Sequence, residues 1–437
     1  MPFFSVLMPT RNRASLLRSS LETAAQQRFE DYEIVVSDNN SIDDTKAVTE
    51  GFMKSSDKVK YINPGRDLSM CDSWEYALQH AAGDYITYLS DDDGLILEAL
   101  PYIKALLSKF PIEVLVWPCA YYHHQDVPEP EKQATLNCDI TSGNLFEVPS
   151  ELIIEGLSSF DRMHVVIPKG LNCIFARSVL DKPLKKTGRF FSPPFPDYSA
   201  AYHMLGTLDS YHFIDVPLYI SGTSVQSNTG MRYARKEKYE DYLSLFDRDL
   251  LAGCPYQMRY LITSYLLPTF LMFQRIYPEK MGAYRPNIDV FLKESFAELV
   301  IYEDYEDISE ELEQLASYMR KHFGGDETFE ALWKNHLASR DPQRKSDHLG
   351  RFAREARNFL RRNETLYRVA KKAKDLIAPA SPTYFEFQGV PSMFDASKLL
   401  TDALRPIMKA PSEVTLTRAI SRDFLTNQTA QRQAAAI

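Results

Sequence analysis

The chain has few of the residues that mark secreted, zinc-binding or membrane-spanning proteins. Its five cysteines are odd in number, scattered along the 437 residues, and include no C-x-x-C pair. Neither a disulfide framework nor a zinc site is therefore indicated, and a reducing compartment fits best. No run of about 20 apolar residues occurs, and Met1 leads directly into a strand-like segment where a signal peptide would lie. We expect a cytoplasmic protein, with peripheral contact at the inner face of a membrane left open.

Excess positive charge and several well-known catalytic motifs are missing as well. The net charge is −9, whereas a general nucleic-acid binder carries a basic domain or stripe, so no nucleic-acid partner is expected. There is no P-loop, G-x-G-x-x-G, G-x-S-x-G or H-E-x-x-H sequence. The length exceeds the roughly 250–300 residues at which one core stops growing, which predicts more than one domain.

What the sequence does contain is an alternation of strand-like and helical segments through residues 3–120. Short apolar runs are followed by segments whose apolar residues recur at helical spacing. The expected strands are Phe3–Met8, Tyr32–Ser37, Val59–Ile62, Tyr85–Leu89 and Val114–Trp117. This alternation predicts an α/β fold, with a Rossmann-like, mostly parallel sheet flanked by helices.

Long helical patterns replace this alternation after residue 231. We therefore predict an α/β domain at residues 1–230 and a largely α-helical C-terminal domain at residues 231–425. Residues 426–437 lack large apolar side chains apart from Ile437 and are expected to form a disordered tail.

Three polar loops follow the predicted strands. They are Pro9–Arg13, Asp38–Asp44 and Ser90–Asp93. Ligands of open α/β sheets bind beyond the carboxyl ends of the strands, so these loops are expected to meet at one edge of the sheet.

Asp91, Asp92 and Asp93 are three consecutive carboxylates, which raise one another's pKa unless a positive charge lies among them. Mg²⁺ or Mn²⁺ suits a site with one or two carboxylates, water and phosphate oxygens. The alternative is that these aspartates only cap a helix or form a turn. The same alternative applies to Asp38.

These loops resemble the inverting family-2 glycosyltransferases of the GT-A fold. The resemblance is carried by Ser5–Arg13 (SVLMPTRNR), Glu33–Thr45 (EIVVSDNNSIDDT) and Ala82–Asp93 (AGDYITYLSDDD), in family order and spacing. It is close over residues 3–120 and loose to about residue 230.

The resemblance implies roles for individual residues. Those expected to bind the nucleotide sugar are Pro9, Thr10, Arg11, Asp38, Asn40, Arg66 and Asp91. The metal ion is assigned to Asp92, with Asp93 as second choice. Ser90 replaces the usual first acid of the D-x-D element, and Asn39-Asn40 replaces the more usual Asp-Gly or Asn-Gly. Arg66 is expected to reach the diphosphate, the alternative being an exposed surface arginine.

The family's catalytic base lies in a Glu-Asp-Tyr segment at the start of a helix. Here Pro196-Asp197-Tyr198 follows a strand-like run, so the resemblance assigns the base to Asp197, with Pro196 in place of the glutamate. An ordinary helix N-cap is the alternative for Asp197.

The resemblance thus implies an inverting, metal-dependent transfer of sugar, with a UDP-sugar as the expected donor. The expected acceptor is a glycan or a lipid-linked glycan, in surface polysaccharide biosynthesis. The alternative is a catalytically inactive relative that binds nucleotide or glycan and scaffolds an assembly.

One basic segment stands out in the C-terminal half. Residues 344–374 contain eleven lysines and arginines against three acids, and apolar residues recur at helical spacing over 344–377. Such a helix can lie on an anionic membrane, and the alternative is a helix packed on its own protein with a solvated basic face. An acidic run at residues 303–313 is expected to form a solvated helix face, and it could also pair with the basic segment within the chain or across a homodimer.

Overall fold

A computed structural model describes most of the chain. The described residues are 1–140, 143–160, 166–227, 254–256, 258, 261–304, 307–340, 383–405, 408–410 and 413–417. They fall into two compact units, Met1–Phe291 together with Tyr384–Ile437, and Leu292–Thr383. The boundary predicted at residues 230/231, the basic segment 344–377 and the tail 426–437 lie outside the described residues. The predicted domain division therefore stays a prediction.

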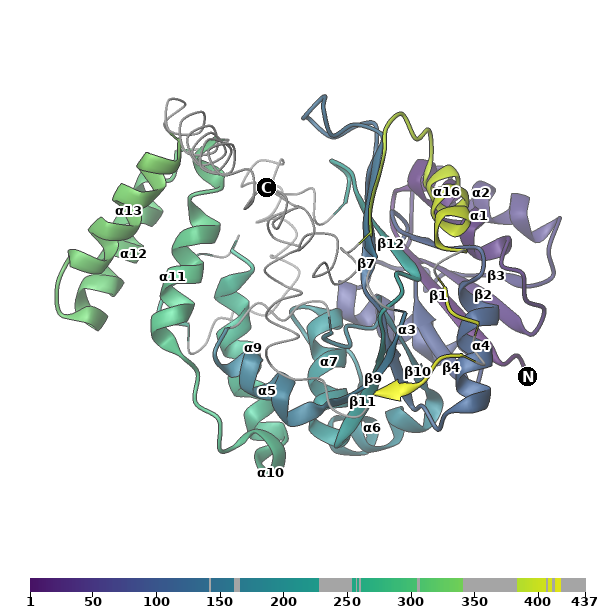
Figure 1. Cartoon of the computed structure of the whole chain (residues 1–437), viewed down its shortest axis with the longest axis horizontal. Helices are drawn as coiled ribbons and strands as arrows, with labels where there is room; N and C mark the ends of the chain where they lie inside the picture. Colours follow the sequence, from purple (N-terminus) through teal and green to yellow (C-terminus); the bar gives the residue numbers. More distant parts are fainter. Residues whose placement is uncertain are drawn as a thin grey trace, which may run out of the picture. The chain divides into compact units, whose positions relative to one another are not determined.

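A nine-stranded sheet forms the centre of the first unit (Figure 1). Its strand order is β14-β9-β11-β6-β10-β4-β1-β2-β3. The strands are β1 (Phe4–Thr10), β2 (Tyr32–Asp38), β3 (Val59–Ile62), β4 (Tyr85–Tyr88), β6 (Val114–Val116), β9 (Leu145–Pro149), β10 (Cys173–Ala176), β11 (Ser210–Ile214) and β14 (Leu416–Thr417).

The pairing within this sheet is mixed, with a parallel part that contains the first strands of the chain. β1 runs parallel to β2 and β4, and β2 runs parallel to β3. β10 runs antiparallel to its neighbours β4 and β6. All seven residues of β2 are buried, as expected for a central parallel strand covered on both faces.

Helices accompany these strands in the order predicted from the sequence. Those of the first unit are α1 (Ala14–Ala25), α2 (Thr45–Met53), α3 (Met70–Gln79), α4 (Ala99–Lys109), α5 (Ser150–Ser158), α6 (Asp181–Thr187), α7 (Pro196–Thr207), α9 (Thr263–Ile276), α10 (Pro278–Met281) and α16 (Met393–Leu404), with a 3-10 turn at Arg177–Leu180. The α/β class with helices flanking the sheet and a helical region later in the chain is confirmed.

A second sheet of five strands was not predicted from the sequence. Its order is β13-β8-β7-β12-β5, with β5 (Gly94–Leu95), β7 (Cys119–His123), β8 (Thr135–Ile140), β12 (Tyr219–Thr223) and β13 (Thr383–Phe387). β12 pairs in parallel with β7 and antiparallel with β5, the short strand that comes directly after the three aspartates. The acidic loop is thus attached to both sheets.

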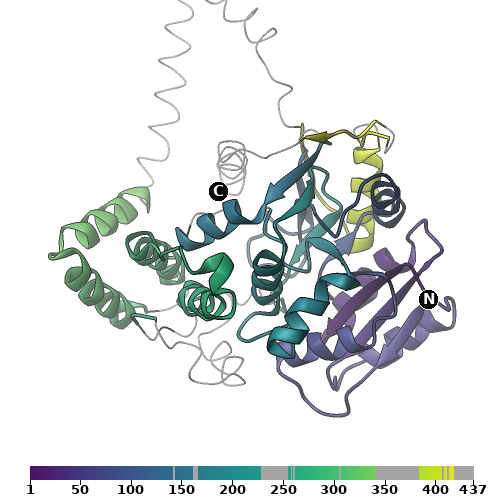
Figure 2. The same ribbon diagram turned by 90° about the horizontal axis from the view of Figure 1, so that it is seen from below.

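The second unit is helical. It contains most of α11 (Ile288–Leu299), a 3-10 turn at Tyr302–Asp304, α12 (Ser309–Phe323) and α13 (Glu327–Arg340). α12 and α13 lie side by side (Figure 2). α12 ends at Gly324, whose φ of 79° is a left-handed conformation that glycine adopts without steric cost. Among the described residues, no helix combines the length and the apolar character needed to cross a bilayer.

Candidate active site

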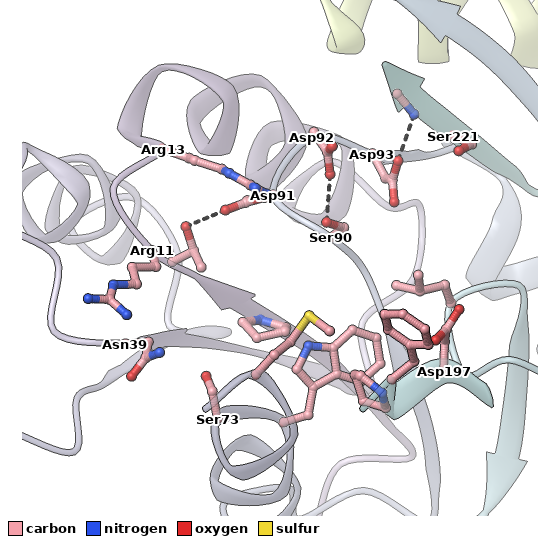
Figure 3. Close-up of a pocket in the computed structure, with 18 of the residues that line it drawn as sticks. Arg11, Arg13, Asn39, Ser73, Ser90, Asp91, Asp92, Asp93, Asp197 and Ser221 are labelled. Carbon is pink, nitrogen blue, oxygen red and sulfur yellow. Dashed lines mark hydrogen bonds and ion pairs between the residues drawn. The ribbon is translucent and has the colours of Figure 1, made fainter. Parts of the chain in front are cut away.

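A cavity of about 430 Å³ lies beyond the carboxyl ends of β1 and β4 (Figure 3). Its polar lining comes from Thr10, Arg11, Arg13, Asn39, Ser73, Ser90, Asp91, Asp92, Asp93, Asp197 and Ser221. Its remaining lining is mainly apolar, from Pro9, Leu68, Met70, Trp74, Leu171, Phe195, Pro196, Tyr198, Gly222 and Ile262. The cavity therefore brings the predicted nucleotide loop, the acidic turn and the predicted base to one site.

Asp91 points toward the loop after β1. Its carboxylate accepts a hydrogen bond from the Thr10 hydroxyl at 2.7 Å and an ion-paired hydrogen bond from Arg13 at 3.0 Å. Thr10 is the last residue of β1, and Arg13 is the N-cap residue of α1. The first aspartate of the turn is thus engaged with the predicted nucleotide loop.

Asp93 points the other way, toward the second sheet. One carboxylate oxygen accepts from the backbone N–H of Gly222 at 2.6 Å, and the other accepts from the Tyr219 hydroxyl. Both donors belong to β12. Asp93 therefore ties the acidic turn to this strand.

Asp92 lies between these two aspartates and has fewer partners. Within the described part of the chain its carboxylate makes one hydrogen bond, from the Ser90 hydroxyl at 2.6 Å. Its second carboxylate oxygen is thus left for a ligand in the cavity. The Asp92 carbonyl accepts from the His124 ring at 3.0 Å, which fixes the backbone of the turn.

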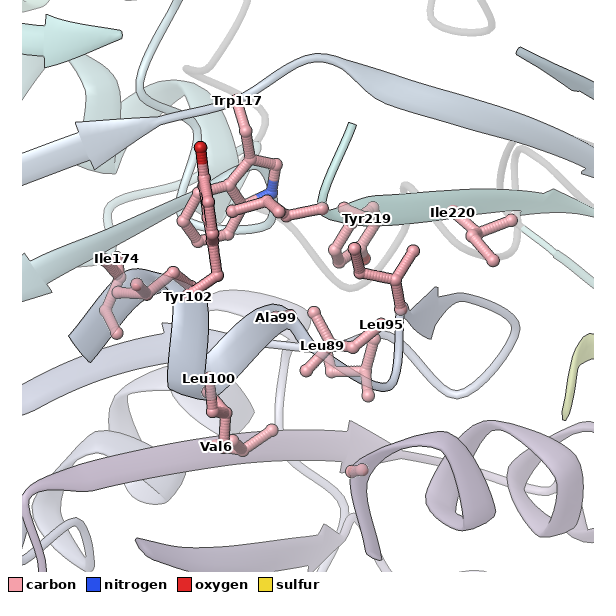
Figure 4. Packing of buried hydrophobic residues seen from close by; sticks show 14 of the residues in the cluster. Val6, Leu89, Leu95, Ala99, Leu100, Tyr102, Trp117, Ile174, Tyr219 and Ile220 are labelled. Carbon is pink, nitrogen blue, oxygen red and sulfur yellow. The ribbon is translucent and has the colours of Figure 1, made fainter. Parts of the chain in front are cut away.

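The residues on both sides of the acidic turn are packed in the hydrophobic core. Leu89, just before the turn, and Leu95, just after it, are buried in one cluster with Tyr219 and Ile220 of β12 (Figure 4). The Ser20 hydroxyl of α1 donates to the Ser90 carbonyl at 2.8 Å. The acidic residues therefore stand on a backbone that is held by packing and by hydrogen bonds.

The electrostatics of the turn favour a cation. Burial raises the pKa of Asp93 well above its usual value, and the charge of Asp92 adds to this. Burial also raises the pKa of Asp91, although Arg13 acts against the shift. Because a nearby positive charge stabilises carboxylates, a divalent cation would offset this cost.

The donor set fits Mg²⁺ or Mn²⁺ held by few protein ligands. No cluster of three or more histidine, cysteine, aspartate or glutamate side chains suited to a metal ion occurs among the described residues. A site with one carboxylate oxygen from Asp92 agrees with this, since such ions commonly take one or two carboxylates and fill their remaining positions with water and phosphate oxygens.

The nucleotide loops are joined through Asp67, which the sequence did not single out. Arg11 forms an ion pair with Asp67 at 2.6 Å, and the Asn40 amide donates to the same carboxylate at 2.8 Å. Asn39 donates to the Leu68 carbonyl and accepts from its N–H, both at 2.9 Å. The loops after β1, β2 and β3 are thereby linked at one edge of the sheet.

Three of the predicted binding residues do not line the cavity. Asp38 is buried and accepts from the Ser41 N–H at 2.9 Å and from the Tyr61 hydroxyl at 2.6 Å. Asn40 contacts Asp67 as described, and Arg66 is exposed. Asn39, beside Asp38, reaches the cavity instead. A role for these three residues in binding remains a prediction.

Asp197 lies in the first turn of α7, after Pro196 at the start of the helix. Figure 3 draws it apart from the acidic turn, on another side of the cavity. Burial raises the pKa of Asp197, and the positive charge of Lys169 acts against the shift. A carboxyl group whose pKa lies nearer neutrality is suited to accept a proton.

Aromatic side chains surround the part of the cavity that contains Asp197. Trp74 stacks on Tyr88 with ring centroids 4.5 Å apart, and Phe195 contacts Tyr265 edge to face. Trp74, Phe195 and Tyr198 line the cavity. They offer flat apolar surfaces of the kind on which the C–H face of a sugar ring can pack.

Several residues at the site were not predicted to contribute. Arg13 and Asn39 lie within the motifs that carry the family resemblance, so their positions were a usable signal. Tyr219, Gly222 and Trp74 reach the site from elements outside these motifs.

Residues 5–160 match the family described as glycosyl transferase family 2. Relatives are similar over part of the chain. A GalNAc(5)-diNAcBac-PP-undecaprenol beta-1,3-glucosyltransferase of Campylobacter jejuni is 41% identical over 101 residues, which are 23% of this chain and 33% of that protein. A PGL/p-HBAD biosynthesis glycosyltransferase of Mycobacterium bovis is 30% identical over 117 residues, which are 26% and 46% of the two chains. The chain thus spans less than half the length of these relatives.

Solved structures of low identity are also similar. TarS 1-349 of S. aureus, in complex with UDP-GlcNAc, is 14% identical, with coverage of 74% of this chain and 93% of that chain and a TM-score of 0.43. Mannosyltransferase PcManGT of Pyrobaculum calidifontis, in complex with GDP-Man and Mn²⁺, is 16% identical, with coverage of 74% and 87% and a TM-score of 0.37.

Proposed function

Since residues 5–160 belong to glycosyl transferase family 2, we propose that the chain transfers a sugar from a nucleotide diphosphate sugar to an acceptor hydroxyl, with inversion at the anomeric carbon. The observation that carries the proposal is the shared cavity. Asp92, with one carboxylate oxygen left unbonded by the described residues, and Asp197, a partly buried carboxyl group, line it together with Pro9, Thr10 and Arg11.

The donor is proposed to bind with its nucleoside against the loop after β1 and its diphosphate beside the acidic turn. Asp92 would hold Mn²⁺ or Mg²⁺, which as a Lewis acid would stabilise the charge on the departing diphosphate. Arg13, which lines the same cavity, adds a fixed positive charge on this side.

The acceptor is proposed to lie on the other side, against Trp74, Phe195 and Tyr198. Asp197 takes the proton of the acceptor hydroxyl while the oxygen of that hydroxyl attacks the anomeric carbon. The bond from that carbon to the diphosphate oxygen breaks, and the leaving group keeps the electron pair. General-base assistance of this kind contributes about 10²–10⁴ in rate.

A UDP-sugar donor and a lipid-linked glycan acceptor are proposed, in surface polysaccharide biosynthesis at the cytoplasmic face of the membrane. The support is the Campylobacter jejuni relative, whose name specifies an undecaprenol-linked acceptor and a glucosyltransferase activity. A thermal-shift screen of UDP-glucose, UDP-galactose, UDP-GlcNAc and GDP-mannose with MnCl₂ would identify the donor, since a ligand that binds the folded chain stabilises it.

Two substitutions test the proposed roles of Asp92 in metal binding and of Asp197 as the base. Asp92→Asn keeps the size of the side chain but loses the charge, so Mn²⁺-dependent binding of the selected donor should weaken at least about tenfold, given the strength of metal–carboxylate contacts. Asp197→Asn should bind the donor within about twofold of wild type and lose about 10²–10⁴ in turnover. Calorimetry gives the affinities, and nucleotide release gives the turnover.

Control measurements distinguish a metal-dependent enzyme from a chain that only binds the nucleotide. Titration without MnCl₂ should show little difference between Asp92→Asn and wild type. Unchanged Mn²⁺-dependent affinity in Asp92→Asn would refute the metal assignment. A wild-type chain that binds donor but neither transfers its sugar nor hydrolyses it would instead be a nucleotide-binding scaffold.

A further inference from the structure

Hydroxyl groups on the helices of this chain commonly bond to the helix backbone. Those of Thr49 and Thr401, both buried, donate to the carbonyl oxygen four residues earlier, at 3.0 and 2.7 Å. This bond is a usual way in which a serine or threonine inside a helix satisfies its hydroxyl group. A buried helical hydroxyl that lacks it is expected to have another partner.

Ser73 of α3 is such a residue. Its backbone N–H donates to the Ser69 carbonyl at 2.8 Å, as in a regular helix, but its hydroxyl makes no hydrogen bond to any residue that the structure describes. Ser73 is only 5% exposed, and it lines the cavity. Figure 3 shows its oxygen directed away from the helix. The hydroxyl therefore faces the cavity and is available both to donate and to accept a hydrogen bond.

Ser73 lies on the side of the cavity that the nucleotide loops form. Ser69, to whose carbonyl it bonds, is the N-cap residue of α3. The preceding residue, Leu68, exchanges two hydrogen bonds of 2.9 Å with the Asn39 side chain. Figure 3 draws Ser73 near Asn39 and apart from Asp197. The turn of α3 that carries Ser73 is thus joined to the loop after β2.

Other polar side chains on this side of the cavity are already engaged within the protein. The Thr10 hydroxyl donates to Asp91 at 2.7 Å. The Arg11 guanidinium is paired with Asp67 at 2.6 Å. Ser73 can therefore bond to a nucleotide without giving up a hydrogen bond of its side chain to the described part of the chain.

The lining next to Ser73 is otherwise apolar. Leu68, Met70 and Trp74 belong to the same helix or to the loop just before it, and all three line the cavity. A ligand that covers these side chains excludes water, and a hydroxyl left without a partner is then costly. A ligand that binds well here therefore presents a hydrogen-bonding group to Ser73. The hydroxyls of a ribose and the polar edge of a nucleobase are groups of this kind.

We propose that Ser73 is a binding residue for the nucleotide of the donor, and that its hydroxyl forms a hydrogen bond with the nucleoside. The inference rests on the proposed function, which puts the nucleoside against the loop after β1. It adds a contact from α3, an element outside the three motifs that carry the family resemblance.

Calorimetry with the full-length chain and MnCl₂ tests this contact. The ligands are the donor selected by the thermal-shift screen and its free nucleotide, UDP or GDP. In Ser73→Ala the Kd of the free nucleotide should rise about three- to tenfold, which is the effect of losing one neutral hydrogen bond. The Kd of the donor should rise by the same factor, because the two ligands share the nucleoside. An unchanged Kd of the free nucleotide, or a loss confined to the sugar-bearing donor, would overturn the proposal.

The stability of the unliganded chain distinguishes binding from a structural role. Alanine has a higher helix propensity than serine, and the Ser73 hydroxyl has no bond to lose among the described residues. The Tm of unliganded Ser73→Ala should therefore equal or exceed that of wild type, although its nucleotide affinity is lower. A lower Tm would show that the hydroxyl supports the fold, and the proposal would be wrong.

An exposed serine on another helix provides the matched control. Ser108 of α4 donates to the Lys104 carbonyl at 2.9 Å, and Ser108→Ala should bind the nucleotide as wild type does. A wild-type chain that binds neither nucleotide nor donor would contradict the proposed function and this inference with it. A wild-type chain that binds the nucleotide no better than Ser73→Ala does would contradict this inference alone.

Discussion

His203 is a core residue that is kept uncharged in the folded chain. It lies on α7 with no exposed surface, packed against the rings of Phe190 and Phe273. One ring nitrogen is 2.7 Å from the Tyr277 hydroxyl, and the other has no hydrogen-bond partner among the described residues. Burial lowers its pKa from 6.5 to about 3. Protonating this ring inside the protein is therefore costly.

This predicts a specific loss of stability in acid. Between about pH 6.5 and pH 3 the unfolded chain binds a proton at His203 that the folded chain does not. The contribution is complete above the unfolded pKa and is lost as the pH falls. Between pH 7 and pH 5, wild type should lose about 2 kcal/mol more than His203→Phe, which cannot titrate. Urea unfolding at both pH values measures the difference, and equal losses in the two proteins would contradict the prediction.

Single residues also explain a departure from the family pattern. Asn40 stands where a glycine is more usual, and its φ is 56°, in the left-handed region. Asparagine tolerates this conformation better than most residues. The backbone requirement is thus met, and the Asn40 amide gains a hydrogen bond to Asp67. The sequence marked the substitution, but the partner lies in a loop 27 residues away and could not be predicted.

At the level of elements, the acidic turn depends on its contact with β12. Gly222 pairs with Tyr122 of β7, and its N–H binds the Asp93 carboxylate. A Cβ at Gly222 would stand 1.8 Å from the Asp92 carbonyl oxygen. Since this oxygen belongs to the backbone, a larger residue must displace the turn.

Gly222→Ala should therefore disturb the candidate metal site. We expect Mn²⁺-dependent donor binding to weaken at least about tenfold, because small displacements of catalytic groups have large effects. Calorimetry with the selected donor measures it. Gly51→Ala on α2 is the matched control, since a Cβ there meets no atom within 4 Å. It should bind normally and be slightly stabilised, by about 0.5–1 kcal/mol. Normal binding by Gly222→Ala would show that the turn does not need this contact.

The sequence predicted the elements near the site better than their assembly. Strands such as Val59–Ile62 coincide with the prediction, because their apolar runs are bounded by turns. The five-stranded sheet was not predicted, since β5 is very short and its partner β12 lies far along the chain. Loops after β1 and β4 could be assigned to one site because parallel strands share an edge. The hydrogen bonds from Tyr219 and Gly222 to Asp93 could not be predicted, because only the folded sheet brings these residues together.

At the level of the whole molecule, the N-terminal unit is completed by residues from the far end of the sequence. α16 packs beside α1, as Figure 1 shows, and its buried residues join the core that contains β1 and β2. The Thr401 hydroxyl accepts from the Leu97 N–H at 2.9 Å, and the Ser397 hydroxyl donates to the Leu95 carbonyl at 2.6 Å. These contacts fix the segment on the C-terminal side of the acidic turn.

Two adjacent leucines of α16 test how much the packing of this helix contributes to the free energy of unfolding. Leu400 has no exposed surface and belongs to the core, whereas Leu399 is 39% exposed. Leu400→Ala should lower the free energy of unfolding by about 2–5 kcal/mol, because it removes buried methyl groups and leaves a cavity. Leu399→Ala should change it by less than about 0.5 kcal/mol, as expected of a surface site.

Urea unfolding monitored by circular dichroism compares the two variants under the same conditions. The same variants also report on the site, since β5 and Leu95 connect α16 to the turn that carries Asp92. Leu400→Ala should therefore lower the thermal stabilisation given by donor and MnCl₂, while Leu399→Ala should leave it unchanged. Equal stability of the two variants would mean that the α/β unit holds its core without α16, and that the acidic turn is positioned by β1, β4 and β12 alone.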